Sequence, residues 1–190
     1  MTYKFNCEEE PMPTGHVMMA MSLDGFVARK DHSLDWLNKQ PASGEDHGFN
    51  VFMDSIDVLV MGTGSLKTVL GFGEWPYSKP VVVLSQSMTT EDLPDHLRTR
   101  IEFSTETPQE LWKTLDQRGF NRVYVDGGAV VQSFIKAGYV QDMKITIVPI
   151  LLGDGIRIFG QNGGDIDLDL ISATPFPSGM VDLDYSVKNE

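Results

Sequence analysis

The stretch VYVDGGAVVQSFIKAGYV, residues 123–140, begins as a run of β-branched and aromatic residues and breaks at an Asp-Gly-Gly triplet. An apolar run of this kind predicts a buried strand, and the spacing that follows predicts a helix over 128–138. A helix N-terminus presents unpaired N–H groups, so glycines just before it let a phosphate approach the backbone closely. A tight strand-to-helix turn also calls for glycine. Gly127 and Gly128 therefore fit either a phosphate site or a plain turn.

Short apolar runs of strand length recur upstream of this stretch. Each is almost continuously apolar, as expected for parallel strands that are covered on both faces. Including the strand quoted above, they occupy residues 16–22, 57–62, 81–85, 100–103 and 122–128. Helices are predicted between them over 44–56 and over 107–119, the latter with Thr107 as N-cap and Gly119 as its stop. This alternation predicts a mainly parallel sheet with helices on both faces.

The rhythm changes after residue 140. Residues 141–155, 165–176 and 180–189 are strand-like with only turn residues between them, which predicts an antiparallel C-terminal hairpin. Ile166, Leu168 and Leu170 alternate with aspartates, and this period of two predicts a strand with one buried face and one wet face.

Length and charge limit the classes of function. The 190 residues fit one domain, preceded by an extended leader over residues 1–14. The formal net charge of −12 argues against nucleic-acid and anionic-membrane partners, because both are bound through lysine and arginine. Cys7 is the single cysteine, and no segment has the apolar length of a signal peptide core or a membrane span, so we expect a cytoplasmic protein.

Two further loops follow predicted strands at the same edge of the sheet as the glycine pair. Gly62-Thr63-Gly64-Ser65 precedes a helix, and Ser85-Gln86-Ser87 follows the strand at 81–85. Ligands of open α/β sheets bind outside the carboxyl ends of the parallel strands. Loops of this kind before helices suit an anionic ligand. The four histidines lack the spacing of metal ligands, so we expect no metal.

The segment 21–37 adds candidate groups for chemistry. Asp24 either handles a proton beside a flat ligand or caps its own Asp-Gly turn. Trp36 is either a core anchor or a lid over a ring. Glu45 and Asp46 either contact a substrate or only compensate the dipole of the helix predicted there.

Five stretches together resemble, in order and at suitable spacings, the dihydrofolate-reductase-like family that includes the C-terminal reductase domain of the riboflavin-biosynthesis deaminase-reductase. They are MAMSLDGFVA (19–28), DVLVMGTGSL (57–66), KPVVVLSQS (79–87), VYVDGGAVVQSFI (123–135) and ITIVPILLGDGIRIF (145–159). The resemblance implies a dihydrofolate-reductase-like α/β fold of three layers that binds NADPH.

The resemblance also implies positions for the cofactor. The pyrophosphate and nicotinamide would lie along the loops at 62–65 and 127–130 and beside Ala20. The adenosine ribose with its 2′-phosphate would lie near the loop at 85–87. The implied cofactor-binding residues are Ala20, Gly62, Thr63, Gly64, Ser65, Ser85, Gln86, Ser87, Gly127, Gly128, Ala129 and Val130.

The activity implied by the resemblance is hydride transfer from NADPH to a pterin-like or ribosylaminopyrimidine-like heterocycle. The enzyme type would be that of dihydrofolate reductase or of 5-amino-6-(5-phosphoribosylamino)uracil reductase. Asp24 matches the aspartate that assists proton transfer, and the substrate would contact Asp24, Trp36, Glu45, Asp46 and Phe49. The resemblance further implies a homodimer, with the run from Ile145 to Leu152 as the candidate contact.

One departure from the family pattern concerns the loop at 62–67. Thr63 stands where the family carries an arginine that pairs with a cofactor phosphate, so binding of NADH is not excluded. Lys67, Lys79 and Arg98 are candidates to compensate. The same departure supports the alternative of a non-catalytic nucleotide-binding protein that retains the reductase fold.

Overall fold

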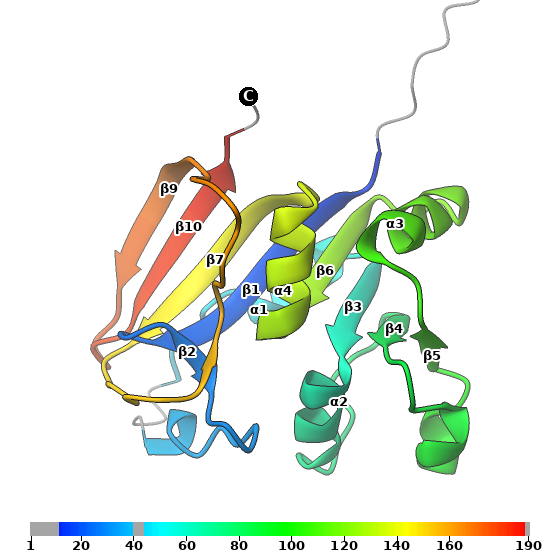
Figure 1. Cartoon of the computed structure of the whole chain (residues 1–190). Helices are drawn as coiled ribbons and strands as arrows, with labels where there is room; N and C mark the ends of the chain where they lie inside the picture. The colour runs from blue at the N-terminus through cyan, green and yellow to red at the C-terminus, as the bar shows by residue number, and fades with distance from the viewer. Residues whose placement is uncertain (1–11, 40–43, 189–190) are drawn as a thin grey trace, which may run out of the picture.

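The computed structural model describes residues 12–39 and 44–188 (Figure 1). Its strands are β1 (Thr14–Ser22), β2 (Phe26–Ala28), β3 (Val58–Gly62), β4 (Val81–Leu84), β5 (Ile101–Ser104), β6 (Arg122–Asp126), β7 (Val140–Val148), β8 (Ile156–Arg157), β9 (Leu168–Pro175) and β10 (Val181–Val187). Its helices are α1 (Phe49–Ser55), α2 (Thr63–Leu70), α3 (Pro108–Gln117) and α4 (Gly128–Lys136), with 3-10 turns at Leu37–Lys39, Thr90–Asp92 and Asp95–Leu97.

The main sheet has eight strands in the order β5-β4-β3-β6-β1-β7-β10-β9. The strands from β5 to β7 are parallel, whereas β10 runs antiparallel to both β7 and β9. The predicted mixed, mainly parallel sheet with a C-terminal antiparallel hairpin is confirmed.

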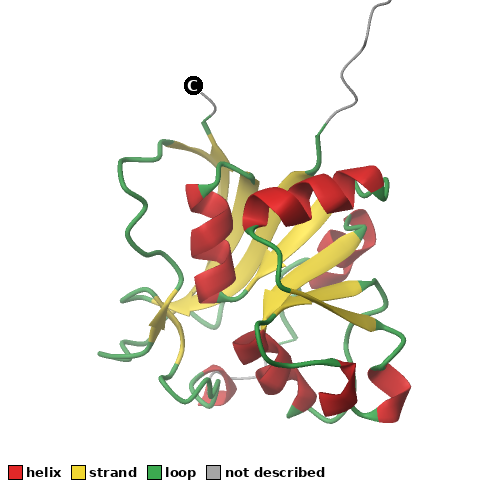
Figure 2. Ribbon diagram, turned by 45° about the vertical axis from the view of Figure 1, so that its right-hand side comes forward, coloured by secondary structure: helices red, strands yellow, loops and turns green. Residues whose placement is uncertain are grey.

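Helices cover both faces of this sheet, which gives the molecule three layers (Figures 1 and 2). One buried cluster joins α3 and α4 to the sheet, and a second cluster joins α1 and α2 to the opposite face. In β4, Val82 belongs to the first cluster while Val81 and Val83 belong to the second. Burial on both faces is the reason that these strands read as continuous apolar runs.

Helix α3 begins and ends where its sequence signals predict. The Thr107 hydroxyl accepts the N–H of Glu110 at 3.3 Å, and the Glu110 carboxylate accepts the N–H of Thr107 at 2.9 Å. Pro108 occupies the first turn, and Gly119 follows the helix with a φ of 75°. This reciprocal cap satisfies N–H groups that the first turn leaves unpaired.

Helix α1 is shorter than the predicted helix over 44–56. It begins at Phe49 because Gly48 has a φ of 79°, a left-handed conformation that no α-helix continues. The loop before it is held by side chains, since Nδ1 of His47 lies 2.9 Å from a carboxylate oxygen of the buried Asp182.

Strand β9 departs from the predicted pattern of one buried face. Leu168 and Leu170 are 37% and 57% exposed, so the prediction is wrong for the single chain. The reason is position: β9 is the outermost strand, and α4 packs over strands nearer the centre of the sheet. The apolar residues of β9 still pair with apolar or aromatic residues of β10, since Leu170 lies opposite Tyr185 and Leu168 opposite Val187.

The dimer contact expected over the run from Ile145 to Leu152 lies partly on strand β7 and stays a prediction. The strand lies between β1 and β10, and Ile145 and Val148 are buried within the chain. In the same run Pro149 and Leu151 are exposed, so part of it is accessible.

A two-stranded ribbon of β2 and β8 was not predicted, because its strands are too short to show a period. Strand β1 begins at Thr14, while residues 1–11 of the expected leader, with Cys7, lie outside the described residues. Within 12–39 and 44–188, no helix combines the length and the apolarity needed to cross a membrane.

Candidate functional site

The order of the parallel strands brings two helix N-termini side by side. Strands β3 and β6 are neighbours, and each leads directly into a helix, α2 and α4 respectively. A Cβ on Gly127 would lie 2.5 Å from Oγ of Ser65, and Gly127 has a φ of 89°. Both the conformation and the close approach therefore require glycine here, which links the turn to the geometry of the neighbouring loop.

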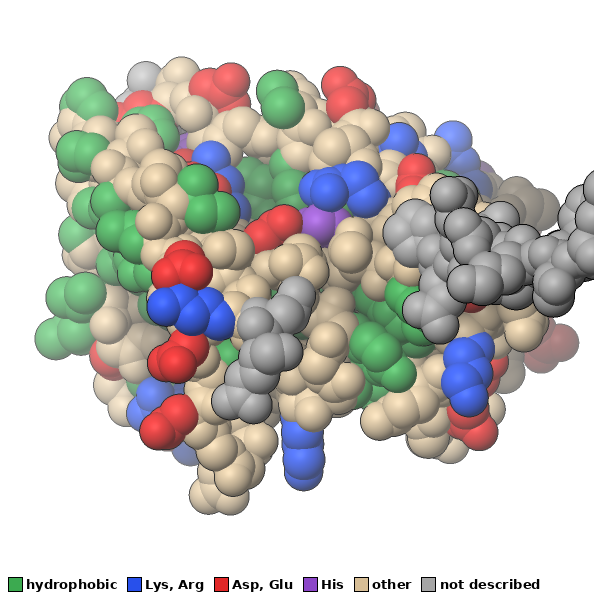
Figure 3. Space-filling view, turned by 90° about the horizontal axis from the view of Figure 1, so that it is seen from above, with side chains coloured by type: hydrophobic (Ala, Val, Ile, Leu, Met, Phe, Trp, Pro, Cys, Tyr) green, Lys and Arg blue, Asp and Glu red, His purple; other side chains and the backbone are tan. Residues whose placement is uncertain are grey.

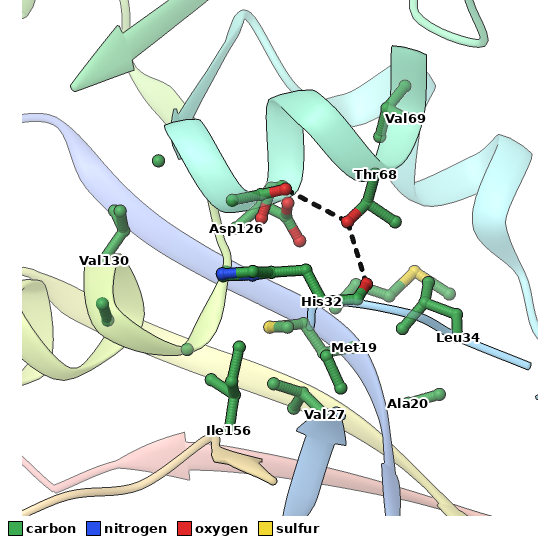
Figure 4. A pocket seen from close by; sticks show the side chains of 18 of the residues that line it. Met19, Ala20, Val27, His32, Leu34, Thr68, Val69, Asp126, Val130 and Ile156 are labelled. Atoms are coloured by element: carbon green, nitrogen blue, oxygen red, sulfur yellow. Dashed lines mark hydrogen bonds between the residues drawn. The ribbon is translucent and has the colours of Figure 1, made fainter. Parts of the chain in front are cut away.

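A cavity of about 700 Å³ opens at this edge of the sheet (Figure 4). Its walls are mostly apolar, and they come from β1, β2, the loop after β2, α2 and the start of α4. The lining residues are Met18, Met19, Ala20, Val27, Ala28, His32, Leu34, Leu37, Phe49, Gly62, Thr63, Gly64, Ser65, Thr68, Val69, Phe72, Pro76, Tyr77, Leu84, Tyr124, Asp126, Gly127, Gly128, Ala129, Val130 and Ile156.

Most residues predicted to bind the cofactor share this cavity. They come from three places in the sequence, and the topology gathers them around the two helix N-termini. The members of this set are Ala20, Gly62, Thr63, Gly64, Ser65, Gly127, Gly128, Ala129 and Val130.

The loop predicted to hold the adenosine ribose lies elsewhere. Ser85, Gln86 and Ser87 border a separate hollow beside β4 and β5, and only the preceding residue, Leu84, reaches the first cavity. The Ser85 hydroxyl accepts the backbone N–H groups of Ser87 and Met88 at 3.2 and 2.8 Å. This hydroxyl thus holds its own turn together.

Asp24 lies outside the cavity lining. Its carboxylate accepts the Ser22 hydroxyl at 2.6 Å and the backbone N–H groups of Leu152 and Gly153 at 3.1 and 2.7 Å. These hydrogen bonds, led by the one from Ser22, lower the pKa of Asp24 to about 2. A group that stays ionised at neutral pH and faces another loop is poorly suited to donate a proton to a ligand in the cavity.

Among the residues predicted to contact a substrate, Phe49 lines the cavity and Trp36 does not. Trp36 is fully buried, which favours the core anchor over the lid. Glu45 accepts the backbone N–H of Ser178 at 2.9 Å, on the C-terminal hairpin. Asp46 accepts the N–H of Gly48 at 2.7 Å and so shapes the turn before α1.

The structure adds Asp126 to the candidate site. Its carboxyl group lines the cavity 3.2 Å from the Tyr124 hydroxyl, which shares its single proton between this carboxyl group and the nearer Met18 carbonyl at 2.8 Å. Burial raises the pKa of Asp126, and hydrogen bonds from Ser65, Tyr124 and the N–H of Gly127 offset part of that rise. Burial likewise raises the pKa of Tyr124. The sequence signal was present, because Asp126 ends the strand that precedes the glycine pair.

His32 is the second addition. It lies in the loop after β2, and its exposed side chain points into the cavity (Figure 4). No sequence pattern marks it, because its place depends on how the loop folds over α2. Among the described residues, no group of three or more His, Cys, Asp or Glu is arranged to hold a metal ion.

Several known proteins are similar to this chain in sequence or in fold. The uncharacterised protein YwjB of Bacillus subtilis (strain 168) is 26% identical over 160 residues, which cover 83% of this chain and 89% of YwjB. A protein of Shewanella sp. PV-4 ascribed to riboflavin biosynthesis is 36% identical, with a TM-score of 0.86 over 93% of this chain and 99% of that one. Dihydrofolate reductase from Enterococcus faecalis, solved with NADP(H), is 15% identical, with a TM-score of 0.60 over 93% of this chain and 97% of that one.

The sequence itself matches a family across nearly the whole fold. The match extends over residues 13–181, from the start of β1 to the start of β10, and so includes both helix N-termini and the cavity between them. The chain therefore belongs to the family of the RibD C-terminal domain.

Proposed function

We propose that this protein is an NADPH-dependent reductase that transfers a hydride to a small pterin-like or ribosylaminopyrimidine-like heterocycle. The observation that carries the proposal is the pair of helix N-termini, α2 and α4, that meet at one cavity of about 700 Å³. Paired N-termini favour a diphosphate, and the volume lies in the range of ligand pockets.

The residues present fit a dinucleotide. The glycines at 62, 64, 127 and 128 line the cavity at the starts of α2 and α4, where the unpaired backbone N–H groups of the two helices suit phosphate oxygens. Beyond the helix N-termini, the walls formed by Met19, Val27 and Ile156 suit a flat ring and exclude water. When bound, the nicotinamide would supply the hydride.

Asp126 is the proposed proton donor. Its carboxyl group lies in the cavity, and burial raises its pKa, so the acid form persists to higher pH than in an exposed aspartate. The Tyr124 hydroxyl, held by the Met18 carbonyl, fixes the orientation of this carboxyl group. Asp24, ionised and engaged by Leu152 and Gly153, is proposed to hold two loops together instead.

A fluorescence titration of the purified protein with NADPH, repeated with NADH at the same salt concentration, tests the cofactor. We expect NADPH to bind with a Kd in the low micromolar range, about −8 kcal/mol. Thr63 stands in place of the family arginine, and its hydroxyl makes no bidentate contact with a phosphate. We therefore expect only a small difference between the Kd of NADPH and the Kd of NADH. If neither NADPH nor NADH binds, the assignment of a dinucleotide cofactor is wrong.

A second candidate is a non-catalytic nucleotide-binding protein with the same fold. The absence of lysine and arginine from the described cavity lining favours it. The two candidates differ in turnover, which is measured as NADPH oxidation with 5-amino-6-(5-phosphoribosylamino)uracil and with dihydrofolate. Binding of NADPH without oxidation by either compound would favour the second candidate.

The assembly proposed is a homodimer in the cytoplasm. Apolar side chains gather along the side of the molecule where β9 lies (Figure 3). On β9, Leu168, Leu170 and Ile171 are 37%, 57% and 64% exposed. A patch of this kind on an edge strand is typical of a contact between subunits.

Leu170→Asp is expected to convert the dimer to monomer, because it places a charge in the apolar patch. Sedimentation velocity measures the change, and the dissociation constant of the dimer should rise at least about tenfold. Val51→Asp is the matched control, since Val51 is 74% exposed and belongs to α1 and not to β9. A parent protein that sediments as a monomer would rule out the dimer.

A further inference from the structure

The cavity holds one side chain that can carry a positive charge among the described residues, and it is His32. The sequence suggested other cations as substitutes for the missing arginine, namely Lys67, Lys79 and Arg98. None of the three lines the cavity. Nζ of Lys79 contacts the Asp54 carbonyl at 3.4 Å, and Arg98 donates to carbonyls of its own loop.

The imidazole of His32 lies directly against the first turn of α2. Its Cε1 and Nδ1 atoms are 2.6 and 2.7 Å from the position that a Cβ on Gly64 would occupy. Any side chain at position 64 would displace the ring, so this glycine makes room for His32. From there the ring reaches into the cavity toward Val130 on α4 (Figure 4). The imidazole thus lies against the start of α2 and points toward α4.

The backbone of His32 is fixed in an uncommon conformation. Among the described residues, His32 is the non-glycine residue whose φ is positive, at 66°. The His32 N–H donates to the Arg29 carbonyl at 2.9 Å, and its carbonyl accepts the Thr68 hydroxyl of α2 at 3.1 Å. Left-handed backbone is unfavourable for a residue with a Cβ, and such positions gather at binding sites.

The ring nitrogens of His32 differ from those of the buried His16 and the half-buried His47. Nδ1 of His16 lies 2.8 Å from Asp142, and Nδ1 of His47 lies 2.9 Å from Asp182. Neither ring nitrogen of His32 is hydrogen-bonded to any residue in 12–39 or 44–188. The main chain is held by α2, and the two polar atoms of the ring are left for a ligand.

We propose that His32, as an imidazolium, supplies the positive charge for the diphosphate of the bound dinucleotide. The inference rests on the proposed function and names the residue that replaces the family arginine at that group. A charged N–H donor adds to the backbone N–H groups of α2 and α4, which carry only partial charges. The diphosphate is common to NADPH and NADH, so His32 raises the affinity for both by the same factor.

The test is His32→Asn, titrated with NADPH and with NADH. Asparagine tolerates left-handed backbone, so the loop is expected to keep its fold while it loses the charge. The Kd of each dinucleotide should rise roughly tenfold, with the ratio of the two unchanged. His96→Asn is the matched control, because His96 is exposed and lies outside the cavity lining, and its affinities should equal those of the parent.

A second variant tests the charge itself. Thr63→Arg in the His32→Asn background places a cation at the cavity from α2, and it should recover most of the lost affinity for both dinucleotides. If the parent binds NADPH and His32→Asn binds it equally well, the role proposed for His32 is wrong while the proposed function stands. A loss for NADPH without a loss for NADH overturns it too, because His32 would then act at the 2′-phosphate. A parent that binds neither dinucleotide overturns the proposed function and this inference together.

Discussion

Replacing Asp126 by asparagine is expected to lower the turnover of a reducible heterocycle about a hundredfold. The amide keeps the size of the side chain and still accepts the Tyr124 hydroxyl, but it has no acidic proton to give. Because burial raises the pKa of Asp126, the parent should be most active below that raised pKa and should lose activity as the pH rises through it. The measurement is kcat for NADPH oxidation with 5-amino-6-(5-phosphoribosylamino)uracil, as a function of pH.

Asp24→Asn separates this role from the one predicted for the SLDG aspartate. Its carboxylate faces Leu152 and Gly153, so we expect a modest loss of thermal stability and a kcat near that of the parent. The Kd of NADPH should stay within about twofold in both variants, because neither carboxylate is proposed to hold the coenzyme. Loss of turnover in Asp24→Asn together with its retention in Asp126→Asn would return the proton to Asp24.

Replacing Trp112 by alanine is expected to lower the free energy of unfolding by about 3–5 kcal/mol. The indole is 1% exposed and stacks on Tyr139, with ring centroids 4.8 Å apart and planes at 14°. Its Nε1 donates to the Pro13 carbonyl at 2.9 Å, which ties the start of β1 to α3. The substitution removes the packing and leaves that carbonyl without its donor. Urea unfolding measures the loss.

Trp112→Phe is the companion variant. It keeps an aromatic ring against Tyr139 and loses the donor to Pro13, so the cost of the hydrogen bond is about 1 kcal/mol, with a smaller packing loss added. If the alanine and phenylalanine variants unfold at the same urea concentration, packing around Trp112 does not stabilise the fold as described.

Periodicity and local signals were sufficient for most of the fold. Parallel strands buried on both faces leave continuous apolar runs, and a capped helix such as α3 carries its own boundaries at Thr107 and Gly119. The buried face expected for β9 was wrong, because a period of two shows which side chains share a face but not what covers that face. The missing cover belongs to the arrangement of the whole sheet, which local patterns do not encode.

The candidate site was predictable where it depends on the ends of strands. Gly62 ends β3 and Gly127 directly follows β6, and because these parallel strands are neighbours, the strand order alone brings the two glycines together. Asp24 and Ser85 were harder, since each lies at the expected edge but turns its polar atoms toward its own or a neighbouring loop. His32 was out of reach, because its place depends on a left-handed residue in a loop that folds back over α2.

The contacts of Asp24 join two segments far apart in the chain, the loop after β1 and the loop after β7. The ribbon of β2 and β8 joins the same two segments, and so does the ion pair of Lys30 with Asp154. One wall of the cavity is thus formed by the central strands. The other wall is formed by the loop after β1 and the loop after β7, which hold each other in place through these contacts. An insertion or deletion in either loop must be matched by the other, so diversification of this wall is expected to proceed by paired changes in loop length.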